Sequence, residues 1–326
     1  KGLIYKKKGS THINEVAIIK DLDQLPFPAI HLLPLKEYSL ANALHPFASI
    51  VTARGCPYRC GFCLKDPPSK TFRTRSPKSV VDEIEDRIRK YGAREINFCD
   101  DAITVRRTHI AGICNEILER GIKIRWQGPT RIDNVDPELL KLMSRAGCKT
   151  LRYGVESGDQ GMLDLMKKGI TIEQIRSAFK WTKEAKIEIM AYFLIGYVND
   201  TPQTIKKTIA FAKELEPDGA IFSIGTPLPQ TDLFKLACKK GLVNKNYWSD
   251  FTLGVQTQRI PYLIDDAEEW SRKALWSFYF RPNYIFKRLL KIRTWDALKK
   301  HISGALSFLC FKMYKEGNGL QKFSPS

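Results

Sequence analysis

The three cysteines that lie closest together are the residues best suited to chemistry. The run Cys56-Pro57-Tyr58-Arg59-Cys60-Gly61-Phe62-Cys63 follows the short apolar and β-branched segment 49–52. Gly55, Pro57 and Gly61 predict a loop, in which the three thiols can turn inward together. Thiolates gathered this closely usually hold a metal or a cluster. A structural zinc site takes four ligands, and so does a closed four-iron cluster. Three cysteines would therefore leave one iron of such a cluster open to a small molecule.

Composition places the chain among globular proteins. Apolar residues make up 43% of its 326 residues and aromatic residues 11%, which excludes a disordered chain. No apolar run approaches the ~18 residues of a membrane span, and no signal peptide is visible. The other five cysteines are scattered through apolar stretches, where they are expected to be small buried residues. We therefore expect a reduced, cytoplasmic protein.

Short strands alternate with amphipathic helices from residue 49 onward, a pattern typical of βα units around a parallel sheet. The predicted strands cover 49–53, 95–99, 123–127, 150–155, 188–195 and 219–224. The predicted helices cover 76–91, 107–120, 136–147, 161–168, 171–185, 201–215 and 231–240. Six such units predict an α/β fold, a partial (β/α)6 TIM-like barrel.

Two further segments flank this barrel. Residues 1–45 are punctuated by proline and predict an extended lead-in, whereas 46–241 form the barrel domain. Residues 242–326 form an aromatic, basic and mostly helical extension, helical from about residue 265. Because the sequence opens on Lys1 rather than Met, we expect that something upstream is missing and that 1–45 is the remnant of a junction.

Polar residues follow the predicted strands at the edge where barrel enzymes do their chemistry. Glu156 and the acidic pair Asp100-Asp101 could take hydroxyls or an ammonium, and Arg131 or Arg152 could pair with a carboxylate. Structural roles compete with these readings: one aspartate could cap the next helix, and the other side chains could form ordinary ion pairs. Other strand-end candidates are Ser157, Gly196, Asn199 and Pro227.

The spacing Cys-x3-Cys-x2-Cys, with Phe62 before the last cysteine, resembles the signature of radical S-adenosylmethionine (SAM) enzymes. Segments 97–101, 153–158, 193–201 and 226–231 resemble further motifs of that family, so the resemblance covers about 46–240. It implies a [4Fe–4S] cluster on Cys56, Cys60 and Cys63. It also implies SAM held by Phe62 and the strand-end residues Asp100, Asp101, Arg131, Glu156, Ser157, Gly196, Asn199 and Pro227. Reductive cleavage of SAM would then yield a 5′-deoxyadenosyl radical that abstracts hydrogen from an organic substrate.

The lead-in DLDQLPFPAI, the ESG segment and the element YFRPNYI resemble a subgroup that carries an N-terminal cobalamin-binding domain. That subgroup includes methyltransferases and an anaerobic porphyrin-ring cyclase. The sequence has no Asp-x-His-x-x-Gly cobalamin motif, so we expect either that the domain has been removed or that this member lacks it. Cobalamin-dependent methyl transfer is therefore one predicted reaction. The alternatives are a radical cyclase or oxidative enzyme on a porphyrin- or lipid-like substrate, a tRNA-modifying enzyme, and a zinc-binding structural module.

The expected partners are a small-molecule or lipid-like substrate and an electron donor such as flavodoxin or ferredoxin. The net charge of +18 is concentrated near the C-terminus, where 271–316 carries 11 Lys or Arg against two acids. This basic tail predicts a solvated face or a peripheral membrane contact. Nucleic acid is not expected, because no RNA-binding module is recognisable.

Overall fold

A computed structural model describes residues 2–34, 37–38, 43–65, 71–256 and 259–291. The chain divides into two compact units, residues 1–278 and 279–326. The barrel belongs to the first unit, and helix α10 (Pro282–Lys291) is the described part of the second. The predicted domain limits at 45 and 241 stay predictions.

A six-stranded parallel sheet is the centre of the first unit. Its strand order is β10-β9-β8-β7-β6-β3, so that successive strands in the sequence are neighbours in space. Every pair in this sheet is parallel, which confirms the predicted α/β fold of βα units. The strands are β3 (Phe47–Ile50), β6 (Glu95–Phe98), β7 (Arg125–Thr130), β8 (Cys148–Glu156), β9 (Glu188–Ile195) and β10 (Gly219–Ile224).

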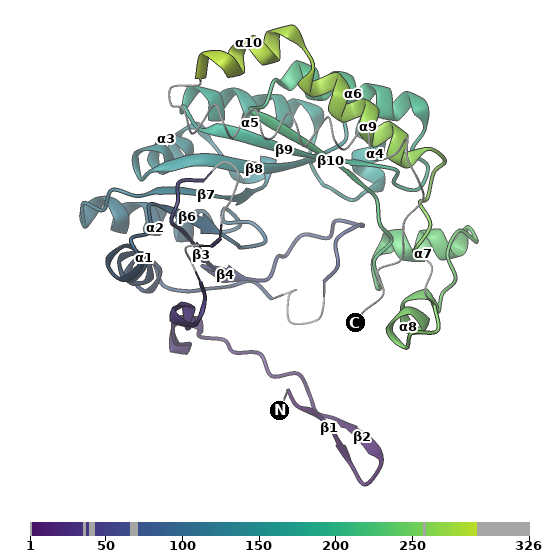
Figure 1. Cartoon of the computed structure of the whole chain (residues 1–326), viewed down its shortest axis with the longest axis horizontal. Coiled ribbons are helices and arrows are strands. Elements are labelled where there is room, and N and C mark those ends of the chain that lie inside the picture. The colour runs from purple at the N-terminus through teal and green to yellow at the C-terminus, as the bar shows by residue number, and fades with distance from the viewer. Residues whose placement is uncertain (1, 35–36, 39–42, 66–70, 257–258, 292–326) are drawn as a thin grey trace. The chain divides into compact units, whose positions relative to one another are not determined.

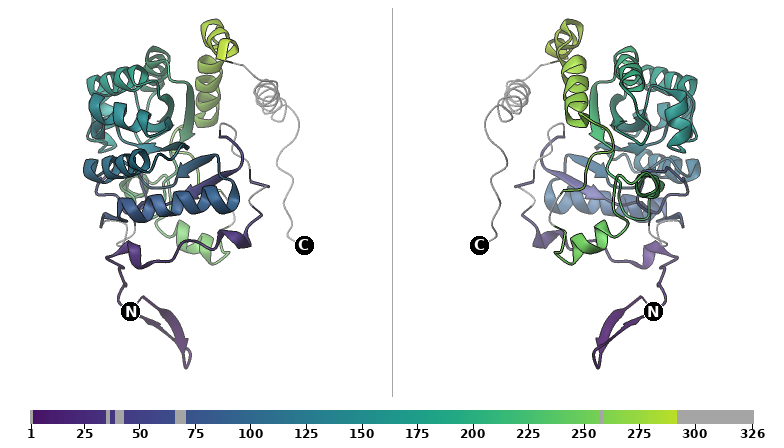
Figure 2. Two further views of the ribbon diagram at one scale, coloured as in Figure 1. Left: turned by 90° about the vertical axis from the view of Figure 1, so that its left-hand side faces the viewer. Right: turned by 90° about the vertical axis from the view of Figure 1, so that its right-hand side faces the viewer.

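Helices connect these strands, and most of them lie along one side of the sheet (Figures 1 and 2). The connecting helices are α1 (Pro77–Tyr91), α2 (Arg107–Glu119), α3 (Pro137–Arg145), α4 (Gln160–Leu165), α5 (Ile172–Glu184) and α6 (Pro202–Leu215), and α7 (Asp232–Lys239) follows the last strand, β10. Ser76, Asp136 and Thr201 cap α1, α3 and α6, each followed by proline at the first turn. The capping oxygen satisfies a free backbone N–H, and proline has none to leave unpaired.

The core forms between the sheet and these helices. Alternate residues of β9 are buried, namely Ile189, Ala191, Phe193 and Ile195, and the residues between them are half-buried. Strand β8 follows the same rule, with Leu151, Tyr153 and Val155 buried. Because strand side chains alternate between two faces, one face of the sheet is the core and the other, the open face, is only partly buried.

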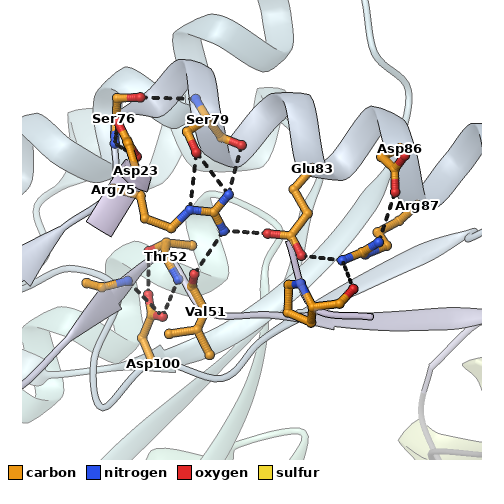
Figure 3. A network of polar contacts seen from close by, with 12 residues as sticks. Asp23, Val51, Thr52, Arg75, Ser76, Ser79, Glu83, Asp86, Arg87 and Asp100 are labelled. Carbon is orange, nitrogen blue, oxygen red and sulfur yellow. Dashed lines mark hydrogen bonds and ion pairs between the residues drawn. The ribbon is translucent and has the colours of Figure 1, made fainter. Parts of the chain in front are cut away.

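The first strand is shorter than predicted, and its end differs. β3 stops at Ile50, and Ala53–Arg54 (β4) pairs instead with Arg73–Thr74 (β5) as a separate antiparallel sheet. Asp100 explains the break, because its carboxylate accepts hydrogen bonds from the backbone N–H groups of Thr52 and Ala53 (Figure 3). Strand β7 is also shifted, since it covers Arg125–Thr130 where the sequence predicts a strand over 123–127.

The lead-in is less extended than predicted. It contains a hairpin of β1 (Ile4–Lys7) and β2 (Ser10–Ile13) and two single turns of 3-10 helix, Leu22–Gln24 and Ile30–Leu32. Leu22 is only 2% exposed, so this segment contributes to the core of the unit.

The predicted helical extension is present as far as it is described. It comprises α8 (Tyr247–Thr252), α9 (Ala267–Tyr279) and α10. The rest of the predicted basic tail, 292–326, lies outside the described residues. No helix within the described ranges is long and apolar enough to cross a membrane.

Candidate active site

The cysteine loop is fixed by backbone hydrogen bonds at its centre. Gly61 donates from its backbone N–H to the carbonyl of Met166 (2.8 Å), and its own carbonyl accepts from Leu233 N–H (2.9 Å). The loop is thus joined to the end of α4 and the start of α7. A Cβ on Gly61 would lie 2.7 Å from the Tyr197 hydroxyl, so only glycine fits at this position.

The three thiols of this loop are free, with Cys56 and Cys60 half-buried and Cys63 exposed. Cys60 Sγ lies 3.6 Å from Nη1 of Arg131, which donates to it. The guanidinium therefore places a positive charge beside one of the three thiols that could hold a metal or a cluster. Lys65 Nζ lies nearby, since it donates to the carbonyl of Cys56 (3.2 Å).

Arg131 is held rigidly at the end of β7. It is 5% exposed, and its guanidinium lies 3.6 Å from the centre of the Tyr58 ring. It also pairs with Asp133 (2.8 Å) and donates to the carbonyl of Lys168 (2.8 Å). Its charge is therefore matched within the protein. The geometry gives Arg131 a part in supporting the cysteine loop, and a contact with a ligand carboxylate stays a prediction.

Glu156 lies at the end of β8 in an unusual conformation. Its φ of 68° is rare for a residue with a side chain, and the pairing of β8 with β9 shifts its register there. The carboxylate accepts from Lys168 Nζ at 2.7 Å, with both side chains at most 10% exposed. A Cβ on Gly154 would lie 2.5 Å from that carboxylate, so the glycine makes room for the pair.

Lys168 is the site residue that sequence reasoning missed. Its ammonium lies 5.9 Å from the centre of the Phe62 ring, which belongs to the cysteine loop. The available signal was the polar turn Lys167-Lys168-Gly169 between α4 and α5, in which Gly169 has a φ of 69°. The structure thus brings Cys60, Phe62, Arg131 and Glu156 together around a lysine.

Asp100 supports the chain that leads to the loop, and its contact with SAM stays a prediction. Its carboxylate accepts from Thr52 Oγ1 (2.5 Å) and from two backbone N–H groups. Burial raises the pKa of Asp100, and these hydrogen bonds oppose the rise. The proposed capping role is wrong for both aspartates, because the N-cap of α2 is Arg106. Asp101 is exposed.

The remaining predicted residues lie at the ends of β8, β9 and β10. Ser157 is buried, and its hydroxyl bonds to Thr208 Oγ1 (3.1 Å). Gly196 and Asn199 have φ values of 81° and 73°, and the side-chain oxygen of Asn199 accepts from Lys240. The Pro227 carbonyl accepts from Trp248 Nε1 at 2.9 Å. Their contacts with a cofactor stay predictions.

The three thiols of the cysteine loop suit a four-iron cluster better than a single metal ion. Within the described part of the chain, no three His, Cys, Asp or Glu side chains lie close enough to hold one metal ion. A four-iron cluster takes each thiolate on a different iron, so its cysteines need not converge on one point. Three free thiols on a fixed loop, with two cations beside it, fit that group.

Comparison with known proteins identifies the family. The model of the radical SAM superfamily matches residues 50–212, which contain the cysteine loop and strands β6 to β9. The chain belongs to the radical SAM superfamily. It is therefore an enzyme of that family, and the alternative of a zinc-binding structural module is excluded.

Two relatives extend the likeness beyond the matched region. The chain is 31% identical over 309 residues to "Uncharacterized methyltransferase PH0819" of Pyrococcus horikoshii, covering 94% of this chain and 66% of that protein. It is 36% identical over 187 residues to the anaerobic magnesium-protoporphyrin IX monomethyl ester cyclase of Cereibacter sphaeroides, covering 56% of this chain and 31% of the cyclase. The chain thus spans about two thirds of one relative and about a third of the other.

A solved structure supports the fold. The radical SAM methyltransferase TsrM from Kitasatospora setae, determined with cobalamin and a [4Fe–4S] cluster bound, superposes with a TM-score of 0.56 and 25% identity. The match covers 61% of this chain and 40% of TsrM. It confirms the partial barrel.

Proposed function

We propose that this protein cleaves SAM reductively and uses the resulting radical on an organic substrate. The observation that carries the proposal is the fixed cysteine loop with Arg131 beside Cys60 and the Glu156–Lys168 pair behind Phe62. Cys56, Cys60 and Cys63 would hold three irons of a [4Fe–4S] cluster, leaving the fourth for the amino and carboxylate groups of SAM. When bound, the cluster and SAM supply one-electron cleavage of the sulfonium, which gives methionine and a 5′-deoxyadenosyl radical.

The protein's own residues would orient SAM and keep water out. Lys168 would hold the Glu156 carboxylate in position, and Glu156 would accept hydrogen bonds from hydroxyls. Below the loop, Met166, Tyr197 and Leu233 form a buried apolar cluster against which Phe62 packs. This packing would exclude water from one side of the radical, which protects it from side reactions.

Methyl transfer is the first candidate for the overall reaction. The Pyrococcus relative is named as a methyltransferase, and TsrM is a radical SAM methyltransferase whose structure contains cobalamin. These likenesses support a cobalamin-dependent methyl transfer for the whole protein. The cyclase relative supports ring cyclisation as the second candidate.

Anaerobic reconstitution tests the proposal directly. The protein should take up about four irons, and incubation with SAM and a reductant should release 5′-deoxyadenosine. Cys60→Ala should abolish that product, because one iron loses its ligand. Cys238→Ala is the matched control, since Cys238 is a free, half-buried cysteine outside the loop. A protein that binds no cluster, or a Cys60→Ala variant with unchanged product, would rule the proposal out.

Product analysis separates the two candidate reactions. Methyl transfer should yield S-adenosylhomocysteine together with 5′-deoxyadenosine, whereas a cyclase yields no homocysteine product. Hydroxocobalamin added to the 326-residue chain should shift its visible spectrum if these residues contribute to cobalamin binding. Flavodoxin and ferredoxin are the electron donors to compare in the same assay.

A peripheral membrane contact is a separate proposal supported by α10. This helix exposes Ile285, Phe286, Leu289 and Leu290, whose spacing places them on one side of a helix, and it also carries Lys287 and Arg288. Such a helix should bind vesicles of phosphatidylcholine containing phosphatidylserine in a sedimentation assay. Replacing Phe286 and Leu290 with serine should abolish the binding. Equal binding of this variant would contradict the contact.

A further inference from the structure

Arg152 is an arginine on the open face of the sheet, away from the helices. Its neighbours in β8, Tyr153 and Leu151, point into the core, where the Tyr153 hydroxyl bonds to Thr182 of α5 (2.8 Å). Side chains alternate along a strand, so Arg152 points to the opposite face. The same alternation in β6 buries Phe98 and places Asn97 on the open face.

Neutral groups hold the Arg152 guanidinium in place. Nη1 donates to Asn97 Oδ1 (2.6 Å) and Gln127 Oε1 (3.2 Å), and Nη2 donates to the carbonyl of Phe98 (2.8 Å). These bonds use three of the five N–H groups of an arginine. Nε–H and one N–H of Nη2 remain, which is the edge of a guanidinium that binds a carboxylate with two hydrogen bonds.

No carboxylate among the described residues forms an ion pair with Arg152. Glu95 comes closest through the network, because it accepts from Gln127 Nε2 (2.9 Å), but it pairs with Arg125 (3.4 Å). A half-buried cation without a counter-charge is unfavourable, because it loses part of its hydration and gains no ion pair to compensate. The arrangement favours an anion from outside the protein.

Apolar side chains share this face of the sheet beyond Arg152. Met190 of β9 is its register partner, and Tyr192 lies one step further along beside Ile221 of β10. Met190 and Tyr192 are half-buried, and Ile221 is 38% exposed. The open face is therefore polar over β6 to β8, and over β9 and β10 it carries Met190, Tyr192 and Ile221 together with the polar residues Glu188 and Ser223.

We propose that Arg152 binds the carboxylate of the substrate, an organic acid whose apolar body lies over Met190, Tyr192 and Ile221. The proposal rests on the function proposed above and names the substrate class for that site. Glu156 lies four residues further along β8, so the backbone positions of Arg152 and Glu156 are about 13 Å apart at the usual rise of a strand. At that separation the two side chains would contact different ligand groups. A single cation held by neutral oxygens suits the single charge of a carboxylate.

Binding of a model acid and its amide tests this assignment. The probes are 4-phenylbutyrate and 4-phenylbutyramide, titrated calorimetrically into the cluster-loaded protein with SAM present. The wild type should bind the acid at least tenfold more tightly than the amide, as expected for a charge-assisted bidentate pair. In Arg152→Gln the difference in affinity between acid and amide should vanish. In Arg152→Lys it should be intermediate, because a lysine keeps the charge but cannot form the two parallel hydrogen bonds of a guanidinium.

Three controls make the result decisive. Arg176→Gln removes an exposed arginine from α5 and should leave the preference for the acid unchanged. SAM affinity in Arg152→Gln should change less than twofold; a parallel loss of SAM binding would place Arg152 at SAM and overturn the proposal. An equal preference for the acid in wild type and Arg152→Gln would also overturn it. If the wild type loads no cluster, the acid and the amide are titrated into the protein without cluster or SAM, so that this failure counts against the proposed function alone and the acid preference is still measured.

Discussion

Two arginine networks in this protein differ in how their charges are balanced. In the first, Glu83 lies between Arg75 and Arg87 at the interface of α1 with the strand ends, and the side chains of Glu83 and Arg87 are at most 2% exposed (Figure 3). In the second, Arg152 bonds only to neutral oxygens on the open face of the sheet. An arginine matched by a buried carboxylate stabilises the fold, whereas one held by neutral groups remains able to bind an anion.

The largest expected effect comes from breaking the first network. Glu83→Gln should lower the free energy of unfolding by about 3 to 5 kcal/mol, because Arg75 and Arg87 both lose the carboxylate between them and Arg87 keeps only Asp86. Urea unfolding measures the loss. The matched control is Glu85→Gln on the exposed side of α1, which should cost less than about 1 kcal/mol. Similar losses in both variants would show that the first network is not a stabilising ion pair.

Acid should lower the free energy of unfolding through His109, whose pKa is affected by Arg75 of the first network. Burial, followed by the charges of Arg106 and Arg75, lowers the pKa of His109 to about 4. The unfolded chain takes up this proton near pH 6.5 and the folded chain does not. Stability should therefore be constant above about pH 6.5 and fall by about 3 kcal/mol down to about pH 4.

Urea midpoints across this pH range, for the wild type and His109→Gln, check the expectation. The variant should lose much less stability on acidification. Asp100 acts with the opposite sign, because its raised pKa gives stability at low pH that is lost as the pH rises through that pKa. Equal acid sensitivity in both proteins would exclude His109 as the cause.

Asp100 connects the first network to the cysteine loop. Asp100→Asn should cost about 1 to 3 kcal/mol, since an amide replaces one of the two accepting oxygens that hold Thr52 and Ala53. The reconstituted variant should also lose iron faster to a chelator. Thermal unfolding and the rate of iron release measure the two effects. Asp101→Asn, at an exposed position, should behave as wild type, and a similar loss there would refute the supporting role of Asp100.

The smallest effect on stability should come from the second network. Arg152→Met should change the free energy of unfolding by about 1 kcal/mol or less, because it removes hydrogen bonds to neutral acceptors and also a half-buried charge. Arg87→Met is the comparison and should cost more, about 2 to 3 kcal/mol, since Glu83 and Asp86 each lose a cationic partner and Glu83 keeps only Arg75. If urea unfolding gives equal losses for the two, the distinction between a paired and a ligand-binding arginine fails.

Much of the fold could be predicted because its signals are local. The apolar spacing of Val80, Val81, Ile84 and Ile88 in α1 and the proline after each capping residue mark helices within a few residues. The end of β3 could not be predicted in this way. It depends on Asp100, which lies 48 residues further along the chain and accepts a hydrogen bond from the backbone N–H of Thr52.

The candidate site shows the same division. The cysteines could be found by their spacing, because one short loop carries all three. Lys168 was missed, because its role depends on reaching Glu156 and Phe62 from a turn between two helices. Arg131 was expected at a ligand, which stays a prediction, and only the folded chain shows its contacts with Asp133 and Cys60.

By itself the sequence determined the order of the βα units, the family and the three thiols, since each follows from spacing along a few neighbouring residues. The tertiary structure decided how the charges of Arg87 and Arg152 are buried and which other groups reach them. Arg87 has Glu83 one helical turn before it in α1, a pair that the sequence itself offers, whereas the partners of Arg152 come from β6 and β7 and only folding brings them together. Their difference arises because α1 brings Glu83 against one, while β6 and β7 bring only amide and carbonyl oxygens against the other.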